Sequence, residues 1–331
     1  MEPVPIVNTL TPSQAAGLGA ARAPIPWRAY ARLAKLDIYD YYLSVPLLAA
    51  LAGPTGWAAP GRTSVVLLLV LLGQVTLTAA LVTFDDVTGY RDGSDAANYG
   101  PDAPARRLAR KPLVTGALTD GQAVRFGWLA LAACAVSWAG ALALAPHRPA
   151  WAVLGVVLWF ALGFQYSWWL KLSYHGLQEV FIAALGWFFV LPFHGLLTGQ
   201  AGGLAIVQTL LFGLGPLLFG VYSNINDIPG DRSVGRPTVA VLTSPRGNAL
   251  FVAAVSALET VLIAGAAVSG LAPWWFLPAM APVIGLRVRQ FVLGIGRGDI
   301  LRARLLGVRI HRLAVALLVA VDLLLDLGAA A

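Results

Sequence analysis

Long stretches without charge are the feature that most constrains this sequence. No Asp, Glu, Lys or Arg occurs from Val180 to Asn226, whereas a helix of about 20 apolar residues already spans a bilayer. The stretch is therefore too long for one helix, and its Gly-rich segment 198–203 predicts a turn between two. Only 12% of all residues are charged, against about 25% in soluble domains. The sequence predicts an all-α integral membrane protein, because helices satisfy their own backbone hydrogen bonds in lipid.

The same criterion, applied along the whole chain, predicts a bundle of nine transmembrane helices. The predicted spans are 40–58, 63–84, 123–145, 150–169, 177–198, 203–223, 248–269, 272–289 and 310–328. Residues 1–26 contain no basic region followed by a short apolar run, which predicts a disordered cytoplasmic tail and no signal peptide. Residues 27–331 then form a single transmembrane domain. Four acidic residues within predicted spans are expected to face the protein interior, because charge is costly in lipid, namely Glu179, Glu259, Asp322 and Asp326. For Asp322 and Asp326 the alternative is a position at the outer interface.

The basic residues predict the orientation of the bundle. If successive loops alternate between the two sides, all of the 23 Lys and Arg except Arg62 and Arg148 fall on one side. The positive-inside rule places this side in the cytoplasm, together with the N-terminus, and leaves the C-terminus outside. The net charge of +7 is thus a topology signal with some attraction to anionic lipid, and it requires no nucleic-acid partner. We expect a multi-pass protein of the plasma membrane.

Acidic residues gather in two clusters, each at the predicted cytoplasmic end of a span. The first cluster follows the second span and consists of Asp85, Asp86, Asp92, Asp95 and Asp102. The second cluster follows the sixth span and consists of Asp227 and Asp231, together with the amide residue Asn224. Because both clusters lie at the same depth, both can face one cavity, which would form a cytoplasmic mouth of the bundle.

The spacing within the clusters points to a metal site. The three residues of the second cluster are spaced i, i+3 and i+7, which places them on one stripe of a helix. Asp85 and Asp92 share a face in the same way if the helix continues past Gly89. Facing carboxylates repel unless a cation lies between them, and oxygen ligands suit Mg²⁺. The predicted metal ligands are Asp85, Asp92, Asp95, Asp227 and Asp231. The alternative is a solvated acidic loop that merely ends a helix, which is less favoured for two clusters than for one.

Basic and aromatic residues near the clusters complete a predicted diphosphate site. A leaving diphosphate needs its charge neutralised, and Mg²⁺ with Lys or Arg supplies this. The candidates for substrate binding are Arg107, Lys111, Lys171, Asn224, Arg236, Tyr166, Tyr174 and Glu179. For a single arginine the topology signal is the competing interpretation, whereas Lys171 is the one charge in its connection.

Three motifs, which follow one another along the chain at 111–113, 174–179 and 226–238, together resemble the UbiA superfamily of intramembrane prenyltransferases. The segment 226–238 contains Asp227 and Asp231, which match the D-x-x-x-D motif of that family. Lys111-Pro112-Leu113 is similar to its K/R-P-L segment, and 174–179 is similar to the Y-R-G-L-G-E segment of the menaquinone-type branch. The resemblance extends from Trp27 onward and implies a bundle of nine helices with one catalytic domain.

The first acidic cluster departs from the menaquinone-type form N-D-x-x-D-Y-x-x-G-x-D of this family. Asp85 replaces the Asn, and Gly89 replaces the second Asp. Asp92 is an additional carboxylate on the predicted face of Asp85 and can compensate for Gly89. His175 replaces the usual Arg of the later segment.

The resemblance implies a Mg²⁺-dependent enzyme that ionises an isoprenoid diphosphate and transfers the prenyl group to an aromatic, quinoid or lipid acceptor. Glu179 is the candidate for contact with the acceptor. The implied catalytic residues are Asp85, Asp86, Asp92, Asp95, Asp227 and Asp231.

Two other functions compete with prenyl transfer. Terpene cyclases occur within the superfamily, and Gly89 favours that interpretation, since some cyclases have Gly or Ala in this position. The carboxylate spacing after Gly89 fits the menaquinone-type form better, so we favour the transferase. A transporter or ion channel is the third interpretation, but acidic pairs confined to one end of the bundle argue against a pathway through its middle.

Overall fold

Helices form the regular structure in the computed structural model, which describes residues 26–35, 40–98 and 110–330. No strand occurs within these ranges, which confirms the all-α prediction. In chain order the helices are α2 (Pro26–Leu33), η1 (Asp40–Leu43), α3 (Ser44–Leu51), α4 (Gly53–Gly56), α5 (Pro60–Asp92), α6 (Ser94–Asn98), α8 (Asp120–Leu144), α9 (Ala150–Gly163), η2 (Leu172–His175), α10 (Gln178–Thr198), α11 (Gly203–Ser233), α12 (Val239–Leu242), α13 (Pro245–Val268), α14 (Phe276–Phe291), a π-helical turn (Val292–Gly296) and α15 (Ile300–Ala330). Residues 1–25 of the predicted tail lie outside the described residues.

Six helical segments of the described chain are long and apolar enough to cross a bilayer. They are α5, α8, α10, α11, α13 and Phe276–Gly296. The remaining three predicted spans also overlap helices, but Asp40–Leu51 and Ala150–Gly163 are shorter apolar segments, and α15 carries four arginines in its first half. The multi-pass membrane character is thus confirmed, while the number of nine spans stays a prediction.

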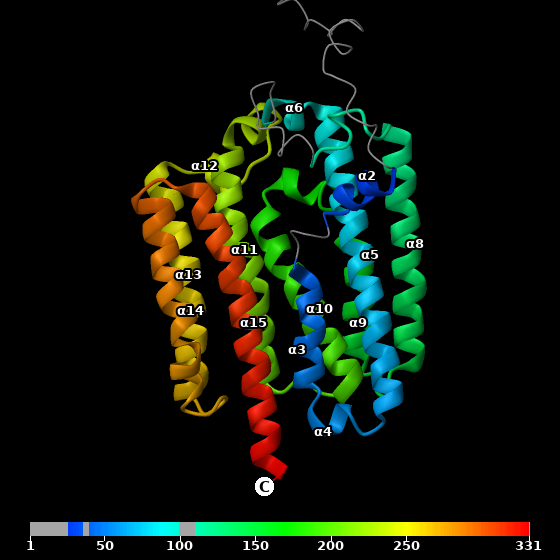
Figure 1. Ribbon diagram of the computed structural model, residues 1–331, viewed down its shortest axis with the longest axis vertical. Coiled ribbons are helices and arrows are strands. Elements are labelled where there is room, and N and C mark those ends of the chain that lie inside the picture. The colour runs from blue at the N-terminus through cyan, green and yellow to red at the C-terminus, as the bar shows by residue number, and fades with distance from the viewer. Residues whose placement is uncertain (1–25, 36–39, 99–109, 331) are drawn as a thin grey trace, which may run out of the picture.

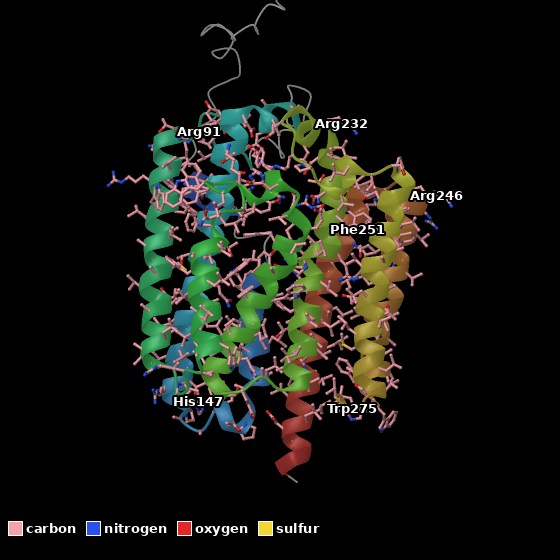
Figure 2. All side chains as sticks on the ribbon, turned by 180° about the vertical axis from the view of Figure 1, so that it is seen from behind. Arg91, His147, Arg232, Arg246, Phe251 and Trp275 are labelled. Atoms are coloured by element: carbon pink, nitrogen blue, oxygen red, sulfur yellow. The ribbon has the colours of Figure 1, made fainter. Side chains whose placement is uncertain are left out.

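The long helices run side by side along the longest axis of the molecule (Figure 1). α5 and α8 lie at one side of the bundle and α13 and α14 at the other, with α3, α10, α11 and α15 between them. α2, α6 and α12 gather at one end, whereas α4 and the C-terminus lie at the opposite end. Figure 2 shows Arg91 and Arg232 at the α6 end and His147 at the other.

A close approach of two glycines fixes the contact between α10 and α11. A Cβ atom on Gly186 would lie 2.5 Å from the Cα atom of Gly213, so neither position has room for a side chain. Small residues let helix backbones pack closely in membranes. Because the two helices are antiparallel neighbours, the start of α10 lies beside the last turns of α11.

Both acidic clusters begin on helices that extend beyond the predicted spans. α5 continues to Asp92 and α11 to Ser233, whereas the apolar criterion ended them at 84 and 223. The condition that the first helix continues past Gly89 is therefore met. The second cluster lies on one continuous helix although Pro229 is inside it.

A buried ion pair joins α13 to α14. The guanidinium of Arg287 donates to both carboxylate oxygens of Glu259, at 2.8 and 3.0 Å, and to Gln290 Oε1 at 2.9 Å. Gln290 Nε2 in turn donates to backbone carbonyls of Leu218 on α11 and Ala303 on α15. The interior placement predicted for Glu259 is thus confirmed. Asp322 is also buried and accepts a hydrogen bond from Gln208.

Replacing Arg287 alone tests how much the bundle depends on this pair. Arg287→Met leaves the Glu259 carboxylate buried without its partner, so we expect a loss of about 3–5 kcal/mol in unfolding free energy. The double variant Glu259→Met/Arg287→Met removes both charges and is expected to be more stable than the single variant. Unfolding of the purified proteins in one detergent measures both effects. A double variant less stable than Arg287→Met would contradict the prediction.

Candidate functional site

Side chains from both acidic clusters line a single cavity at the α6 end of the bundle. The cavity has a volume of about 250 Å³. Its carboxylates come from α5, α6 and α11 and belong to Asp85, Asp95, Asp227 and Asp231. Basic side chains line the same cavity, namely Lys35, Arg110, Lys111, Arg236 and Arg304. The structure therefore brings four of the five predicted metal ligands together and interleaves them with positive charge.

The consecutive residues Asp85 and Asp86 have different surroundings. Asp85 Oδ1 accepts a hydrogen bond of 2.7 Å from Ser167 and lines the cavity. Asp86 is buried, and its Oδ1 accepts from Lys35 Nζ at 2.7 Å and from Lys111 Nζ at 2.8 Å. Asp86 is not among the residues that line the cavity. Its charge is thus neutralised by two lysines, while Asp85 stays available to a ligand.

Asp95 reaches the cavity because the chain reverses after α5. Gly93 ends α5 with a φ of 84°, a conformation that favours glycine, and α6 then returns over the helix end. The Asp95 carboxylate fills the space beside Gly89, where an added Cβ atom would lie 3.0 Å from its Cγ. Lys111 Nζ donates to Asp95 Oδ1 at 2.6 Å. Burial, and then the negative charge of Asp86, raise the pKa of Asp95 although Lys111 opposes the shift.

Asp92 lies outside this cavity. Its carboxylate accepts hydrogen bonds from the Tyr174 hydroxyl and the Ser94 amide. It lines a separate groove of about 460 Å³ with Thr88, Arg91, Trp168, Trp169 and Lys171. The structure therefore does not place Asp92 beside Asp85, and Lys171, which lies 5.3 Å from the Tyr174 ring, is also in the groove.

Arg236 connects the two acidic clusters. Its guanidinium lies 3.5 Å from Asp85 and 3.9 Å from Asp231. It also donates to the Tyr174 hydroxyl at 2.9 Å and stacks over the Tyr174 ring at 4.5 Å. Burial alone would lower the pKa of Arg236, but the charge of Asp85 and its neighbouring tyrosines raise it above its ordinary value. Burial raises the pKa of Tyr174, so its hydroxyl keeps its proton.

A sequence model of the UbiA prenyltransferase family matches residues 45–306. The chain belongs to this family. The structure of a digeranylgeranylglyceryl phosphate synthase has the same fold with a TM-score of 0.60 and 14% identity, covering 90% of this chain and 98% of that one. Two UbiA homologues are similar as well, each at 16% identity. The Archaeoglobus fulgidus protein, solved with DMAPP and Mg²⁺, gives a TM-score of 0.56 with 87% of this chain and 98% of that one covered. The Aeropyrum pernix K1 protein, solved in its apo form, gives 0.59 with 88% and 98% covered. No curated protein matches the sequence.

The remaining residues predicted to bind substrate in this UbiA member have distinct positions. Tyr166 and Asn224 line the cavity, whereas Glu179 is buried behind it. Glu179 Oε1 accepts hydrogen bonds from Asn224 Nδ2 at 2.9 Å and from the Val239 amide at 3.0 Å. Arg107 lies outside the described residues.

The sequence analysis of this UbiA member missed several cavity residues, and Gln178, Lys35 and Arg304 are three of them. Gln178 replaces a glycine of the Y-R-G-L-G-E segment, and that departure was the available signal. Lys35 and Arg304 come from distant parts of the chain and carry no local motif, so only the packing of the bundle brings them to the site.

The donor set of this UbiA cavity fits Mg²⁺ with a polyanionic ligand. Carboxylate and amide oxygens from both clusters line it, and these are the hard donors that Mg²⁺ prefers. Within the described residues, no three His, Cys, Asp or Glu side chains are grouped closely enough to hold a metal ion. A bound ion would therefore take part of its coordination from phosphate oxygens and water, as Mg²⁺ commonly does.

Arg236 is expected to stabilise the UbiA site before any ligand binds. Arg236→Met leaves Asp85 and Asp231 without their shared cation, so the free energy of unfolding should fall by about 2 kcal/mol or more. The unfolding free energy of Arg236→Lys should lie between those of the unaltered protein and Arg236→Met, because lysine keeps the charge but loses the planar fork and the stacking. Thermal unfolding in metal-free detergent buffer measures the difference. Arg232→Met, at an exposed residue nearby, is the matched control, and an equal effect of both methionine variants would contradict the assignment.

Proposed function

We propose that this chain is a membrane-embedded, Mg²⁺-dependent prenyltransferase that binds an isoprenoid diphosphate in the cavity at the α6 end. The observation that carries the proposal is the meeting of carboxylates from α5, α6 and α11 with five basic side chains in one cavity. Two structures of the Archaeoglobus fulgidus homologue, described with DMAPP and with GPP and Mg²⁺, support it. The prenyl group would pass to an aromatic, quinoid or lipid acceptor.

The basic residues suit the diphosphate end of the substrate. Lys111 and Arg236 lie between the carboxylates, and Arg304 enters from α15. When the allylic C–O bond breaks, its electron pair stays on the diphosphate oxygen, and these cations stabilise the growing negative charge. Mg²⁺ bound by oxygens of the two clusters would supply further stabilisation of this kind.

The apolar wall of the cavity suits the isoprenoid end. Ile182 and Phe219 line it together with the tyrosines Tyr41 and Tyr166. Such a wall excludes water from an allylic cation, and aromatic faces stabilise its positive charge. The acceptor then forms the new bond to the allylic carbon and loses one proton to solvent, which balances the transfer.

We propose Asp95 in place of Asp92 as the carboxylate that compensates for Gly89. The Asp95 side chain occupies the volume that a residue at position 89 would fill, and it lines the cavity with Asp85. Asp92 belongs to the outer groove. The metal ligands of the proposed site are then Asp85, Asp95, Asp227 and Asp231, with Asp86 holding Lys111 in position.

The proposed orientation follows the positive-inside rule. Nine spans would place the α6 end, the N-terminus and the cavity mouth in the cytoplasm, and the C-terminus outside the plasma membrane. Arg91 and Arg232 at the α6 end support this orientation (Figure 2).

Terpene cyclisation is the alternative function, and one assay separates it from prenyl transfer. Membranes with Mg²⁺ and prenyl diphosphates from C10 to C25 are incubated without an added acceptor, and the extract is analysed by gas chromatography–mass spectrometry. A new cyclic product would establish the cyclase. Product formation that requires an aromatic or quinoid acceptor is the expected result.

Asp85→Ala, Asp227→Ala and Asp231→Ala should each reduce turnover to background without preventing membrane insertion, because each removes a proposed ligand. Asp120→Ala, in a surface ion pair with Arg91, should retain activity. Retained activity in all three cavity variants would refute the site.

A side-chain exchange tests the proposed role of Asp95. Asp95→Ala removes the carboxylate, and Gly89→Asp places a second one against it, so each single variant should bind Mn²⁺ at least about tenfold more weakly in the presence of geranylgeranyl thiodiphosphate. The double variant Gly89→Asp/Asp95→Ala should recover most of the affinity. Electron paramagnetic resonance of Mn²⁺ measures binding directly, without turnover. A loss in Asp92→Asn together with no loss in Asp95→Ala would instead favour the groove residue.

A further inference from the structure

Gln178 is a cavity residue with an unpartnered carbonyl oxygen in its side chain. Its side chain lines the cavity and is only 5% exposed. Its Nε2 donates a hydrogen bond of 2.7 Å to Asn224 Oδ1. Its Oε1, by contrast, is buried and has no hydrogen-bond partner. A buried carbonyl oxygen in this state has lost its water without a replacement, which is unfavourable.

The orientation of the Gln178 amide is set by Glu179. The Glu179 carboxylate oxygen that receives the Val239 amide also receives Asn224 Nδ2, and an ionised carboxylate can only accept. The NH₂ group of Asn224 must therefore face Glu179, which turns the Asn224 carbonyl toward Gln178. That carbonyl needs a donor, so the NH₂ group of Gln178 faces it. The Gln178 carbonyl oxygen is thus left without a hydrogen-bond partner.

The hydrogen bonds from Gln178 to Asn224 and from Asn224 to Glu179 form a relay. A reversed amide would be costly at each step of this relay. Turning Gln178 would set its carbonyl oxygen against the Asn224 carbonyl oxygen, and turning both amides would set the Asn224 carbonyl against the Glu179 carboxylate. The backbone amide of Val239 at the start of α12 holds Glu179 in its position. The group left without a partner on this cavity residue is thus a hydrogen-bond acceptor, and not a donor.

The position of Gln178 suits the second substrate. Asn224, its partner, precedes the metal-ligand candidate Asp227 by less than one turn of α11, so the subsite adjoins the proposed diphosphate position. An isoprenoid chain contains no O–H or N–H group, and a diphosphate bound by metal ions presents only acceptor oxygens. Neither part of the first substrate can therefore satisfy Gln178 Oε1.

We propose that Gln178 Oε1 accepts a hydrogen bond from an O–H or N–H group of the prenyl acceptor, which makes Gln178 a specificity-determining residue for a protic acceptor. The inference rests on the proposed prenyltransferase function. A site that holds a buried acceptor for a hydroxyl group discriminates against the analogue without that hydroxyl, because the buried group is then left unpaired. Glu179 is a positioning residue in this arrangement.

Paired probes that differ only in the hydrogen-bond donor test this proposal. The purified protein in nanodiscs, with Mg²⁺ and geranylgeranyl thiodiphosphate, is titrated with 1-naphthol and with 1-methoxynaphthalene, and with 1-octanol and its methyl ether. Isothermal titration calorimetry gives the dissociation constants. In the unaltered protein at least one hydroxyl probe should bind about tenfold to a hundredfold more tightly than its ether. Gln178→Met keeps the length of the side chain but removes the acceptor, so this ratio should fall to about one.

Two further variants keep the result interpretable. Glu179→Gln replaces a group that only accepts by an amide that can also donate, so the hydrogen bonds of the relay can point in either direction. This variant should still bind both probes but with a lower preference for the hydroxyl group. It therefore gives a result even where Gln178→Met fails to fold. Gln165→Met, in the loop before α10 and hydrogen-bonded to the Ala161 carbonyl, should retain the full ratio. Two outcomes would overturn the proposal. One is that Gln178→Met and Glu179→Gln keep the ether-to-hydroxyl ratio of dissociation constants of the unaltered protein. The other is that the unaltered protein binds neither hydroxyl probe more tightly than its ether.

The failure of the proposed function would look different. Binding of prenyl thiodiphosphates from C10 to C25 with Mg²⁺ is measured first, and the absence of binding for all of them in the unaltered protein would refute the prenyltransferase itself. Binding of the thiodiphosphate together with a probe ratio near one would overturn only the role of Gln178.

Discussion

The arrangement of the α6 end depends on the mutual repulsion of carboxylates in a confined space. Four of them line one cavity, and a fifth, Asp86, is buried directly behind it. Carboxylates so close together and so little hydrated are stable only with cations between them. Arg236 occupies the position between α5 and α11, and Lys111 the position between Asp86 and Asp95. The loops at this end therefore bring basic side chains to the two acidic helix ends.

The positions of the polar side chains at this end depend on glycines in and between the helices. Gly93 reverses the chain so that α6 lies over the end of α5, and the absent side chain at Gly89 leaves room for the carboxylate that α6 brings. The start of α10 lies beside the last turns of α11 because Gly186 and Gly213 let the helices touch. The same contact places Gln178 and Glu179 next to Asn224. Close packing deep in the bundle thus determines the geometry of polar groups at its end.

The sequence predicts the parts of this structure that depend on one helix at a time. Uncharged runs identify the helices, and the i, i+3, i+7 spacing correctly places the second cluster on one stripe of α11. The same reasoning failed to separate Asp92 from Asp85, because a spacing of seven residues says nothing about how α5 meets its neighbours. In the structure Tyr174 and the outer groove surround Asp92, and Lys35 and Lys111 surround Asp86. These pairings join residues far apart in the chain, so no local pattern contains them.

The choice between transfer and cyclisation also depends on tertiary contacts. The glycine at position 89 favours a cyclase when it is considered alone, since it removes a carboxylate from the motif. In the folded chain the carboxylate of Asp95 fills that position, which weakens the argument. A cyclase needs an apolar wall that shapes the isoprenoid, whereas this cavity includes a relay of Glu179, Asn224 and Gln178 that ends in an unpartnered carbonyl oxygen. An oriented buried acceptor has a cost in stability, and a protic second substrate is the ligand that would offset it.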